Sequence, residues 1–192
     1  MKRTIIAIIF ILFAKFSLAQ QELLSFDEHN KYIFYQVDET PGLSADTLHN
    51  RAVYFLKTVF PRFKLKAATN NLALSGDGSF LTYSGVSVLK HENGEVKYVL
   101  NIEFKDQKYR FWLTGFTFTP YERDRYGNFV PKLGIELPLE TAISKLEKKE
   151  LDTHLNETGT FCKQFGERLK LFMLDATTKK QDNAKKPLSD NW

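Results

Sequence analysis

Apolar and polar side chains alternate along residues 100–113, on both sides of the turn-forming dipeptide Asp106-Gln107. If that dipeptide is a two-residue hairpin loop, the residues on either side of it face one another in order along the two strands. The residues that then share one face are all apolar: Leu100, Ile102, Phe104, Tyr109, Phe111 and Leu113. A slip of one residue would turn one strand's apolar side chains to the opposite face. The pattern therefore predicts an antiparallel hairpin with one buried face.

Two further dipeptides, Asp77-Gly78 and Asn93-Gly94, are typical of tight hairpin turns. Counting outward from them extends the apolar face over two more strands. The pairs that would face one another are Leu74 with Leu81 across the first turn, and Leu89 with Tyr98 across the second. We therefore predict four consecutive antiparallel strands, connected as a meander.

The alternation fails at two glycines. The count turns Gly85 toward the core, opposite Ile102; either small residues make room for a helix there, or a bulge turns the neighbouring valines inward. Farther along, a one-residue bulge at Thr114-Gly115 is needed to bring Phe116 and Phe118 to the apolar face. The opposite, half-polar face would carry Phe80, Thr82, Ser84, Val86, Val88, Lys90, Asn101, Glu103, Lys105, Arg110 and Trp112.

Amphipathic helices are available to cover the apolar face. After Ser44 or Asp46 as a cap, and before Pro61, apolar residues recur at helical spacing: Leu48, Ala52, Phe55, Leu56 and Val59. A second stripe, with Thr158 as its predicted cap, consists of Phe161, Cys162, Phe165, Leu169, Phe172 and Met173. A short helix is predicted from Pro138, with Leu139, Ala142, Ile143 and Leu146 facing inward. With one more strand from Lys31, the order indicates an α+β fold: an antiparallel sheet (strand, helix, four-strand meander) with the helices packed on one face.

The N-terminal segment, residues 1–19, has the pattern of a secretory signal. Lys2 and Arg3 precede an apolar run, and Ser17-Leu18-Ala19 forms a small-residue cleavage pattern before Gln20. Lys15 interrupts the run well short of the ~20 apolar residues that a bilayer span needs. We expect cleavage between Ala19 and Gln20, a single domain over residues 20–176, and a disordered tail over residues 177–192. The mature protein is then periplasmic or extracellular, with no membrane span.

The basic excess of the chain lies mainly in this signal. The chain has 27 Lys plus Arg against 23 Asp plus Glu, and the loss of Lys2, Arg3 and Lys15 leaves 24 against 23. Export and a nearly neutral mature charge argue against nucleic acid as a partner. Cys162 is the only cysteine, so no intramolecular disulfide forms, and its place on an apolar stripe predicts a buried packing residue rather than a nucleophile.

Three segments carry a resemblance to a known family: "FDEHNKYIFYQVDETPG", "ADTLHNRAVYFLKTVF" and "YVLNIEFKDQKYRFWLTGF". They resemble a family of secreted bacterial domains of unknown function, over roughly Leu24 to Met173. The resemblance implies a fold similar to that of the TATA-binding protein, and it implies no catalytic residue. Two positions depart from the family pattern, which often has Asp-Gly in place of Asp106-Gln107 and Trp in place of Phe55.

Candidate ligand-binding residues lie on the half-polar face and in the long segment that follows the last strand. Arg110 and Trp112 form a possible stacking pair on that face, although an ordinary exposed sheet pair is the commoner explanation. The segment from Tyr121 to Pro138 is long and aromatic, as segments that carry function tend to be. We therefore assign tentative ligand contacts to Arg110, Trp112, Tyr121, Arg123 and Tyr126.

Two function classes follow. The first is a non-catalytic binding module that engages a peptide, glycan or protein with this face and segment. The alternative is a hydrolase that uses Glu122, Asp124 and Glu136 around residues 121–138, and a cavity holding several carboxyls of raised pKa would favour it. The scattered histidines and glycine-rich turns supply no metal or cofactor motif, so no cofactor is predicted.

Overall fold

A computed structural model describes residues 23–69, 72–85 and 90–175 of the chain. The predicted signal, its cleavage site at Ala19 and Gln20, and the predicted tail lie outside the described residues, as do Val86 and Val88.

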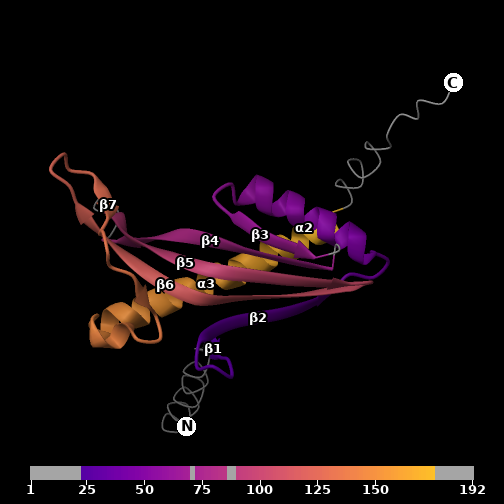
Figure 1. Ribbon diagram of the computed structural model, residues 1–192, viewed down its shortest axis with the longest axis horizontal. Coiled ribbons are helices and arrows are strands. Elements are labelled where there is room, and N and C mark those ends of the chain that lie inside the picture. Colours follow the sequence, from indigo (N-terminus) through magenta and orange to yellow (C-terminus); the bar gives the residue numbers. More distant parts are fainter. Residues whose placement is uncertain (1–22, 70–71, 86–89, 176–192) are drawn as a thin grey trace, which may run out of the picture.

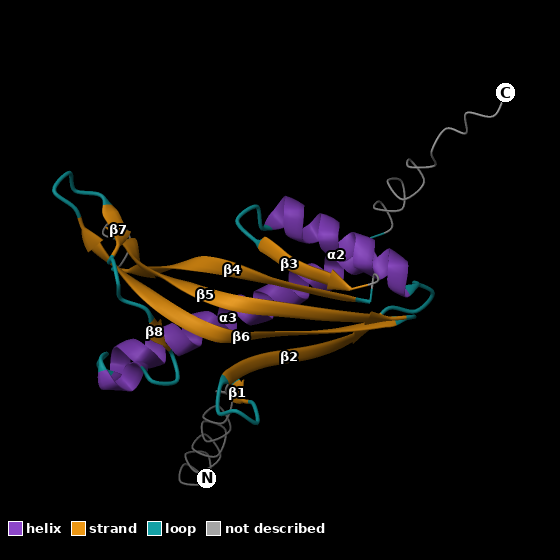
Figure 2. Ribbon diagram, viewed as in Figure 1, coloured by secondary structure: helices purple, strands orange, loops and turns teal. Residues whose placement is uncertain are grey.

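The described chain forms an antiparallel sheet with two α-helices (Figures 1 and 2). The strands are β1 (Ser25–Phe26), β2 (Tyr32–Glu39), β3 (Lys64–Thr69), β4 (Ala73–Ser84), β5 (His91–Lys105), β6 (Lys108–Arg123), β7 (Phe129–Pro131) and β8 (Leu137–Pro138). The helices are α2 (Ala45–Val59), the 3-10 helix η3 (Ala142–Ser144) and α3 (Lys148–Leu174). The strands lie in the order β1-β2-β6-β5-β4-β3, and β7 and β8 both pair with β6. The predicted α+β class, with its strand, helix and four-strand meander, is confirmed.

The hairpin at Asp106-Gln107 forms as predicted. Phe104 lies opposite Tyr109, Ile102 opposite Phe111 and Leu100 opposite Leu113. Gln107, the second residue of the loop, adopts φ 66°, in the left-handed region. The carboxylate of Asp106 also accepts a hydrogen bond from the backbone N–H of Ala45, at the start of α2, over 2.9 Å. The turn therefore ties the sheet to the first helix.

The other two predicted turns are wrong, because Asp77-Gly78 lies inside β4 and Asn93-Gly94 lies inside β5. Both glycines are covered by aromatic rings. A methyl group at Gly78 would overlap the ring of Tyr98, which lies opposite it, and a methyl group at Gly94 would overlap the ring of Phe118. The glycines thus make room for flat rings on the core face and do not reverse the chain.

The pairing of β4 with β5 changes accordingly. Leu74 lies opposite Ile102 and not opposite Leu81. Gly85 follows the end of β4, where it is exposed and has φ 87°, so its predicted place in the core is wrong. The predicted exposure of Phe80 and Thr82 is also wrong. Thr82 is buried, and the ring of Phe80 stacks on Phe161 of α3 with ring centres 4.2 Å apart.

The predicted bulge in β6 is confirmed. Val99 lies opposite Thr114 and Lys97 opposite Thr117, so two residues of β6, Gly115 and Phe116, share the place opposite Tyr98. Gly115 has φ 65°, which glycine adopts without strain. Phe116 and Phe118 are buried beyond it.

Helix α2 begins and ends as predicted. The hydroxyl of Ser44 accepts a hydrogen bond from the N–H of Thr47, and the helix ends at Val59, just before Phe60 and Pro61. Its buried residues include Leu48, Ala52, Phe55 and Leu56.

Helix α3 is longer than predicted. It begins at Lys148, so Thr158 is not its cap; the hydroxyl of Thr158 instead donates to the carbonyl of His154 within the helix, over 2.7 Å. In place of the short helix expected from Pro138, the chain forms β8 and η3, and Ile143 is exposed. The amphipathic pattern there was too short to outweigh pairing with β6.

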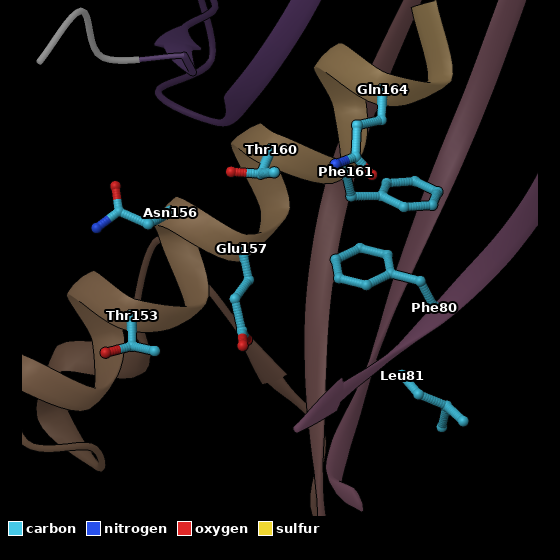
Figure 3. A pocket seen from close by; sticks show the side chains of 8 residues that line it. All are labelled: Phe80, Leu81, Thr153, Asn156, Glu157, Thr160, Phe161 and Gln164. Carbon is cyan, nitrogen blue, oxygen red and sulfur yellow. The ribbon is translucent and has the colours of Figure 1, made fainter. Parts of the chain in front are cut away.

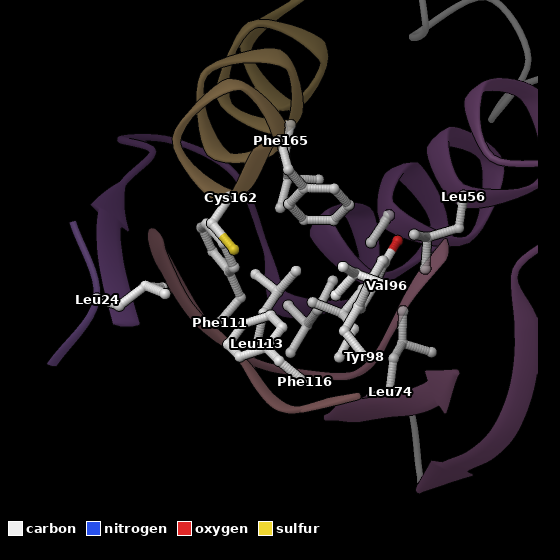
Figure 4. Close-up of a cluster of buried hydrophobic side chains, with 14 of the residues drawn as sticks. Leu24, Leu56, Leu74, Val96, Tyr98, Phe111, Leu113, Phe116, Cys162 and Phe165 are labelled. Carbon is white, nitrogen blue, oxygen red and sulfur yellow. The ribbon is translucent and has the colours of Figure 1, made fainter. Parts of the chain in front are cut away.

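The core lies between the helices and one face of the sheet (Figure 4). The ring of Phe165 on α3 lies 5.7 Å from that of Phe55 on α2 and 5.6 Å from that of Phe111 on β6, measured between centres. Cys162 is buried among these residues, as predicted, and burial raises the pKa of its thiol. The opposite face of the sheet carries no helix within the described chain, which leaves it open.

Candidate functional site

The open face of the sheet is built from the residues of β2, β6 and β5 that alternate with the core residues. Tyr35 on β2 lies opposite Trp112 on β6, and Trp112 lies opposite Asn101 on β5. One step along the face, the neighbours in the same three strands are Val37, Arg110 and Glu103. The open-face positions predicted for Arg110, Trp112, Asn101, Glu103 and Lys105 agree with this register. We call the six residues Tyr35, Val37, Asn101, Glu103, Arg110 and Trp112 the open-face cluster.

The guanidinium of Arg110 is held in place by its neighbours. Its Nε atom donates to Oε2 of Glu103 over 2.7 Å, and its Nη2 atom forms an ion pair with the same oxygen at 2.6 Å. Hydrogen bonds with Glu103 and then Tyr35 raise the pKa of Arg110 above its usual value. The guanidinium carbon lies 5.8 Å from the centre of the Trp112 ring, a cation–π distance. The arginine is thus oriented across the tryptophan before any ligand arrives.

Aromatic and apolar surface surrounds this charge pair. Tyr35 and Val37 are each 51% exposed, and Trp112 is partly buried between Tyr35 and Asn101. Exposed tyrosine, tryptophan and arginine side chains are the usual anchors of binding interfaces. The cluster can therefore bind a partner through stacking and hydrogen bonds.

The structure does not bring Arg110 and Trp112 together with Tyr121, Arg123 and Tyr126. Trp112 and Tyr121 are separated by nine residues along β6, which corresponds to roughly 30 Å of strand. The end of β6 pairs with β7 to form a hairpin that projects from one end of the sheet (Figure 1). The sequence therefore located two separate surfaces and not one.

The hairpin between β6 and β7, residues 121–131, is stabilised by its own contacts. Nε of Arg123 donates to the carbonyl of Gly127 over 3.2 Å, and Tyr126 is 75% exposed beside Arg125. The carboxylate of Asp124 accepts hydrogen bonds from the backbone N–H groups of Tyr126 and Asn128, each at 2.8 Å. Asp124 is thus a turn-forming residue.

The three acids of the hydrolase alternative do not converge. Glu122 pairs with Lys132 at 3.8 Å, Glu136 pairs with Lys97 at 2.5 Å, and Asp124 holds the turn. Backbone hydrogen bonds, first from Asn128, lower the pKa of Asp124, which is opposite to the raised pKa that the alternative required. Each carboxylate is instead part of a separate local contact.

A groove between α3 and β4, of about 480 Å³, was not found from the sequence (Figure 3). Phe80 and Phe161 stack along one side, and Glu157 points into it from α3. Burial raises the pKa of Glu157, whose Oε2 lies 3.5 Å from Nδ1 of the buried His154. The spacing of Glu150, His154 and Glu157 on one helix face is the signal that could have found this pair.

Among the described residues that line the groove, Glu157 is the one acidic or basic side chain. Burial lowers the pKa of His154, so the neutral imidazole is favoured there. Among the described residues, no group of three or more His, Cys, Asp and Glu side chains is placed to hold a metal ion. The open-face cluster remains the better candidate site.

Comparison with known proteins agrees with this architecture. The model of a family described as a domain of unknown function (DUF4468) with TBP-like fold matches residues 34–119, which span β2 to most of β6. This match to DUF4468 thus covers residues 34–119 and leaves the helix α3 outside it. The predicted resemblance to a domain family of unknown function with a TBP-like fold is thereby confirmed over these residues, which include all six residues of the open-face cluster.

Two crystal structures have a fold similar to that of this chain. One is a TBP-like protein from Parabacteroides distasonis, with a TM-score of 0.61 and 12% identity, over 81% of this chain and 99% of that one. The other is a DUF4468 family protein from Bacteroides ovatus, with a TM-score of 0.58 and 12% identity, over 80% of this chain and 91% of that one. A comparison with curated proteins found no significant match. None of the helices in the described ranges has the length and apolar character needed to cross a bilayer.

Proposed function

We propose that the protein is a secreted, non-catalytic binding module that engages a peptide, glycan or protein with its open-face cluster. The observation that carries the proposal is the arrangement of Arg110 across Trp112, fixed by Glu103 and flanked by exposed Tyr35. A guanidinium whose orientation is already set loses less conformational entropy when a ligand binds. The position of the cluster on a rigid sheet, opposite the helix-covered face, supports the same role.

Replacing Trp112 with alanine tests this role. We expect immobilised protein carrying Trp112→Ala to lose the partner that the wild type captures from native periplasm or culture medium. Loss of one cross-strand aromatic pair costs about 1 kcal/mol, so the melting temperature should fall by only about 2–4 °C. Capture is measured by mass spectrometry of the eluted proteins and glycans, and melting by circular dichroism.

Two controls separate binding from folding. Tyr126→Ala removes an equally aromatic but distant side chain on the β6–β7 hairpin, and it should leave capture unchanged. Phe111→Ala removes the adjacent buried ring and should unfold the domain, since such changes cost about 3–5 kcal/mol. Retained capture by Trp112→Ala, or its global unfolding, would contradict the proposal.

Secretion is proposed from the N-terminal pattern and has its own test. We expect the mature protein to begin at Gln20, because Ser17-Leu18-Ala19 offers the small residues that a signal peptidase requires. Intact mass spectrometry of the native protein measures this directly. Ala19→Tyr, which fills the small-residue position, should leave the precursor uncut. A wild-type protein that retains Met1 in membrane fractions would contradict secretion.

A further inference from the structure

The two edges of the sheet differ in how they are protected against pairing with another strand. At one edge, β3 carries the exposed lysines Lys64 and Lys66 and a bulge between Leu65 and Ala67. Lysines and bulges are the usual features that prevent edge-to-edge association. At the other edge, among the described residues, β1 pairs with β2 at Tyr32 and Ile33 and leaves the rest of the strand uncovered (Figure 1). Its remaining residues, 34–39, have no bulge, no proline and no lysine.

The direction of the backbone N–H and C=O groups of β2, either inward to β6 or outward from the sheet, can be assigned residue by residue. Successive residues of a strand direct these groups to opposite sides. Ile33 pairs with Ser25 of β1, whose side-chain hydroxyl donates to the Ile33 carbonyl, on the outer side. The carbonyl of Tyr32 accepts from the side-chain hydroxyl of Thr114 on β6, and the N–H of Thr40 donates to the backbone carbonyl of Gln107, both on the inner side. Tyr35, Val37 and Glu39 therefore direct their backbone groups outward, beyond the reach of β1.

We propose that this edge pairs with the same edge of a second copy of the chain, antiparallel, with Val37 on the two-fold axis. In that register Val37 lies opposite the second Val37, and Tyr35 lies opposite Glu39, so all three outward residues are hydrogen-bonded. The half-exposed valines cover one another, and the hydroxyl of Tyr35 can donate to the carboxylate of Glu39. No like charges face each other.

Neighbouring registers are less favourable. Residues opposite one another must point to the same face of the sheet. The central pair can therefore move from Val37 with Val37 to Gln36 with Gln36 or to Asp38 with Asp38, but not to a position between these. A shift one way places Asp38 opposite the second Asp38, and like charges opposite one another are destabilising. A shift the other way brings Glu39 opposite Ile33, where β1 already occupies the edge. Self-pairing thus has one favoured register, centred on Val37. In that register a second copy supplies an apolar partner for the half-exposed Val37 and a carboxylate for the exposed Tyr35.

The pairing joins the two sheets and places both open-face clusters on one continuous surface. This inference does not depend on the proposed function, because it concerns the edge of β2 and not a ligand of Trp112. The paired segment is short, and small interfaces give weak association. Detection therefore needs a covalent trap as well as a measurement of mass.

Cysteine substitution provides that trap. At a hydrogen-bonded antiparallel pair the Cα atoms are about 5.5 Å apart, within the range of about 4.4–6.8 Å that a disulfide spans. We expect full-length Val37→Cys to form a disulfide-linked dimer under mild oxidation. Tyr35→Cys is the matched control, since its two copies would be about 13 Å apart along the strands. The natural Cys162 is buried and does not compete.

A second variant tests the unlinked dimer. Val37→Pro removes an outward N–H and leaves the bonds to β6 intact, a substitution that edge strands tolerate. Light scattering over a range of concentrations should show the mass of the wild type rising toward twice the chain mass, while Val37→Pro stays at one. A wild type that stays monomeric with no Val37→Cys cross-link would overturn the proposal, as would equal cross-linking of Tyr35→Cys. A monomer whose partner capture still depends on Trp112 would overturn this pairing alone.

Discussion

Replacing Gly94 with alanine is expected to lower the free energy of unfolding by about 3 kcal/mol, the upper part of the usual range for overpacking. The new methyl group would overlap the ring of Phe118 and come within 2.8 Å of the carbonyl oxygen of Thr119. The ring cannot move aside easily, because Phe118 is 1% exposed and its centre lies 4.0 Å from that of the His154 ring. Urea denaturation followed by circular dichroism measures the loss.

A double-mutant cycle with Phe118→Leu identifies the cause. Leucine lacks the flat ring that lies across Gly94, so Gly94→Ala should cost less in that background, with a coupling of about 1–2 kcal/mol. Gly134→Ala serves as a comparison, because a methyl group there meets open space and only the positive φ of 74° is penalised. A Gly94→Ala variant as stable as the wild type, or a cycle without coupling, would show that the Phe118 ring does not explain the glycine.

Contacts between a glycine and an aromatic ring explain why two turns were wrongly predicted: Gly94 lies against Phe118, and Gly78 lies against Tyr98. Asp-Gly and Asn-Gly dipeptides favour hairpin loops as isolated fragments. Here each glycine is instead used within a strand, where its missing side chain leaves space for the ring of Tyr98 or Phe118. Tyr98 is 20 positions from Gly78 and Phe118 is 24 positions from Gly94, each in a neighbouring strand, so a local reading of the sequence cannot detect the contact. The flanking apolar residues agreed with all three turns, so this agreement did not separate the correct turn, Asp106-Gln107, from the two wrong ones.

The residues of the open face could be predicted wherever apolar and polar side chains alternate regularly along a strand. Arg110, Trp112, Asn101 and Glu103 follow from counting outward from the Asp106 turn, and the bulge at Gly115 follows from the position of Phe116. The partnership of Tyr35 with Trp112 did not follow, because β2 is separated from β6 in sequence and only the sheet order brings them together. The separation of Trp112 from the 121–131 hairpin was likewise missed. Tyr121 was predicted to follow the last strand, but it lies within β6 and pairs with β7.

Replacing Asp38 with alanine is expected to destabilise the domain by about 3 kcal/mol, because it removes a buried acceptor from three donors. Asp38 is 4% exposed. Its Oδ2 accepts from Tyr109 at 3.1 Å and from Gln36 at 2.7 Å, and its Oδ1 lies 2.9 Å from Nζ of Lys170. The residue therefore fastens β2 to β6 and to α3. Chemical denaturation of the variant measures the loss.

Much of this cost arises from the phenol that is left behind. Tyr109 is buried, and burial followed by the charge of Asp38 raises its pKa, so it remains a neutral donor without a partner in Asp38→Ala. In a Tyr109→Phe background that penalty disappears, and the cost of Asp38→Ala should fall by about 1–2 kcal/mol. Equal costs in the two backgrounds would place the effect in Lys170 or Gln36 instead.

A second aspartate–lysine pair, Asp77 with Lys66, shows whether the burial of the aspartate or the contact distance decides the cost of removing it. Asp77 and Lys66 approach to 2.6 Å, closer than Asp38 and Lys170, but their side chains are 40% and 60% exposed. An exposed pair of this kind contributes about 0–1 kcal/mol, so Asp77→Ala should cost far less than Asp38→Ala. If the two substitutions cost the same, the contact distance and not the burial of Asp38 would decide its contribution, and the fastening of β2 to α3 through a buried acceptor would be refuted.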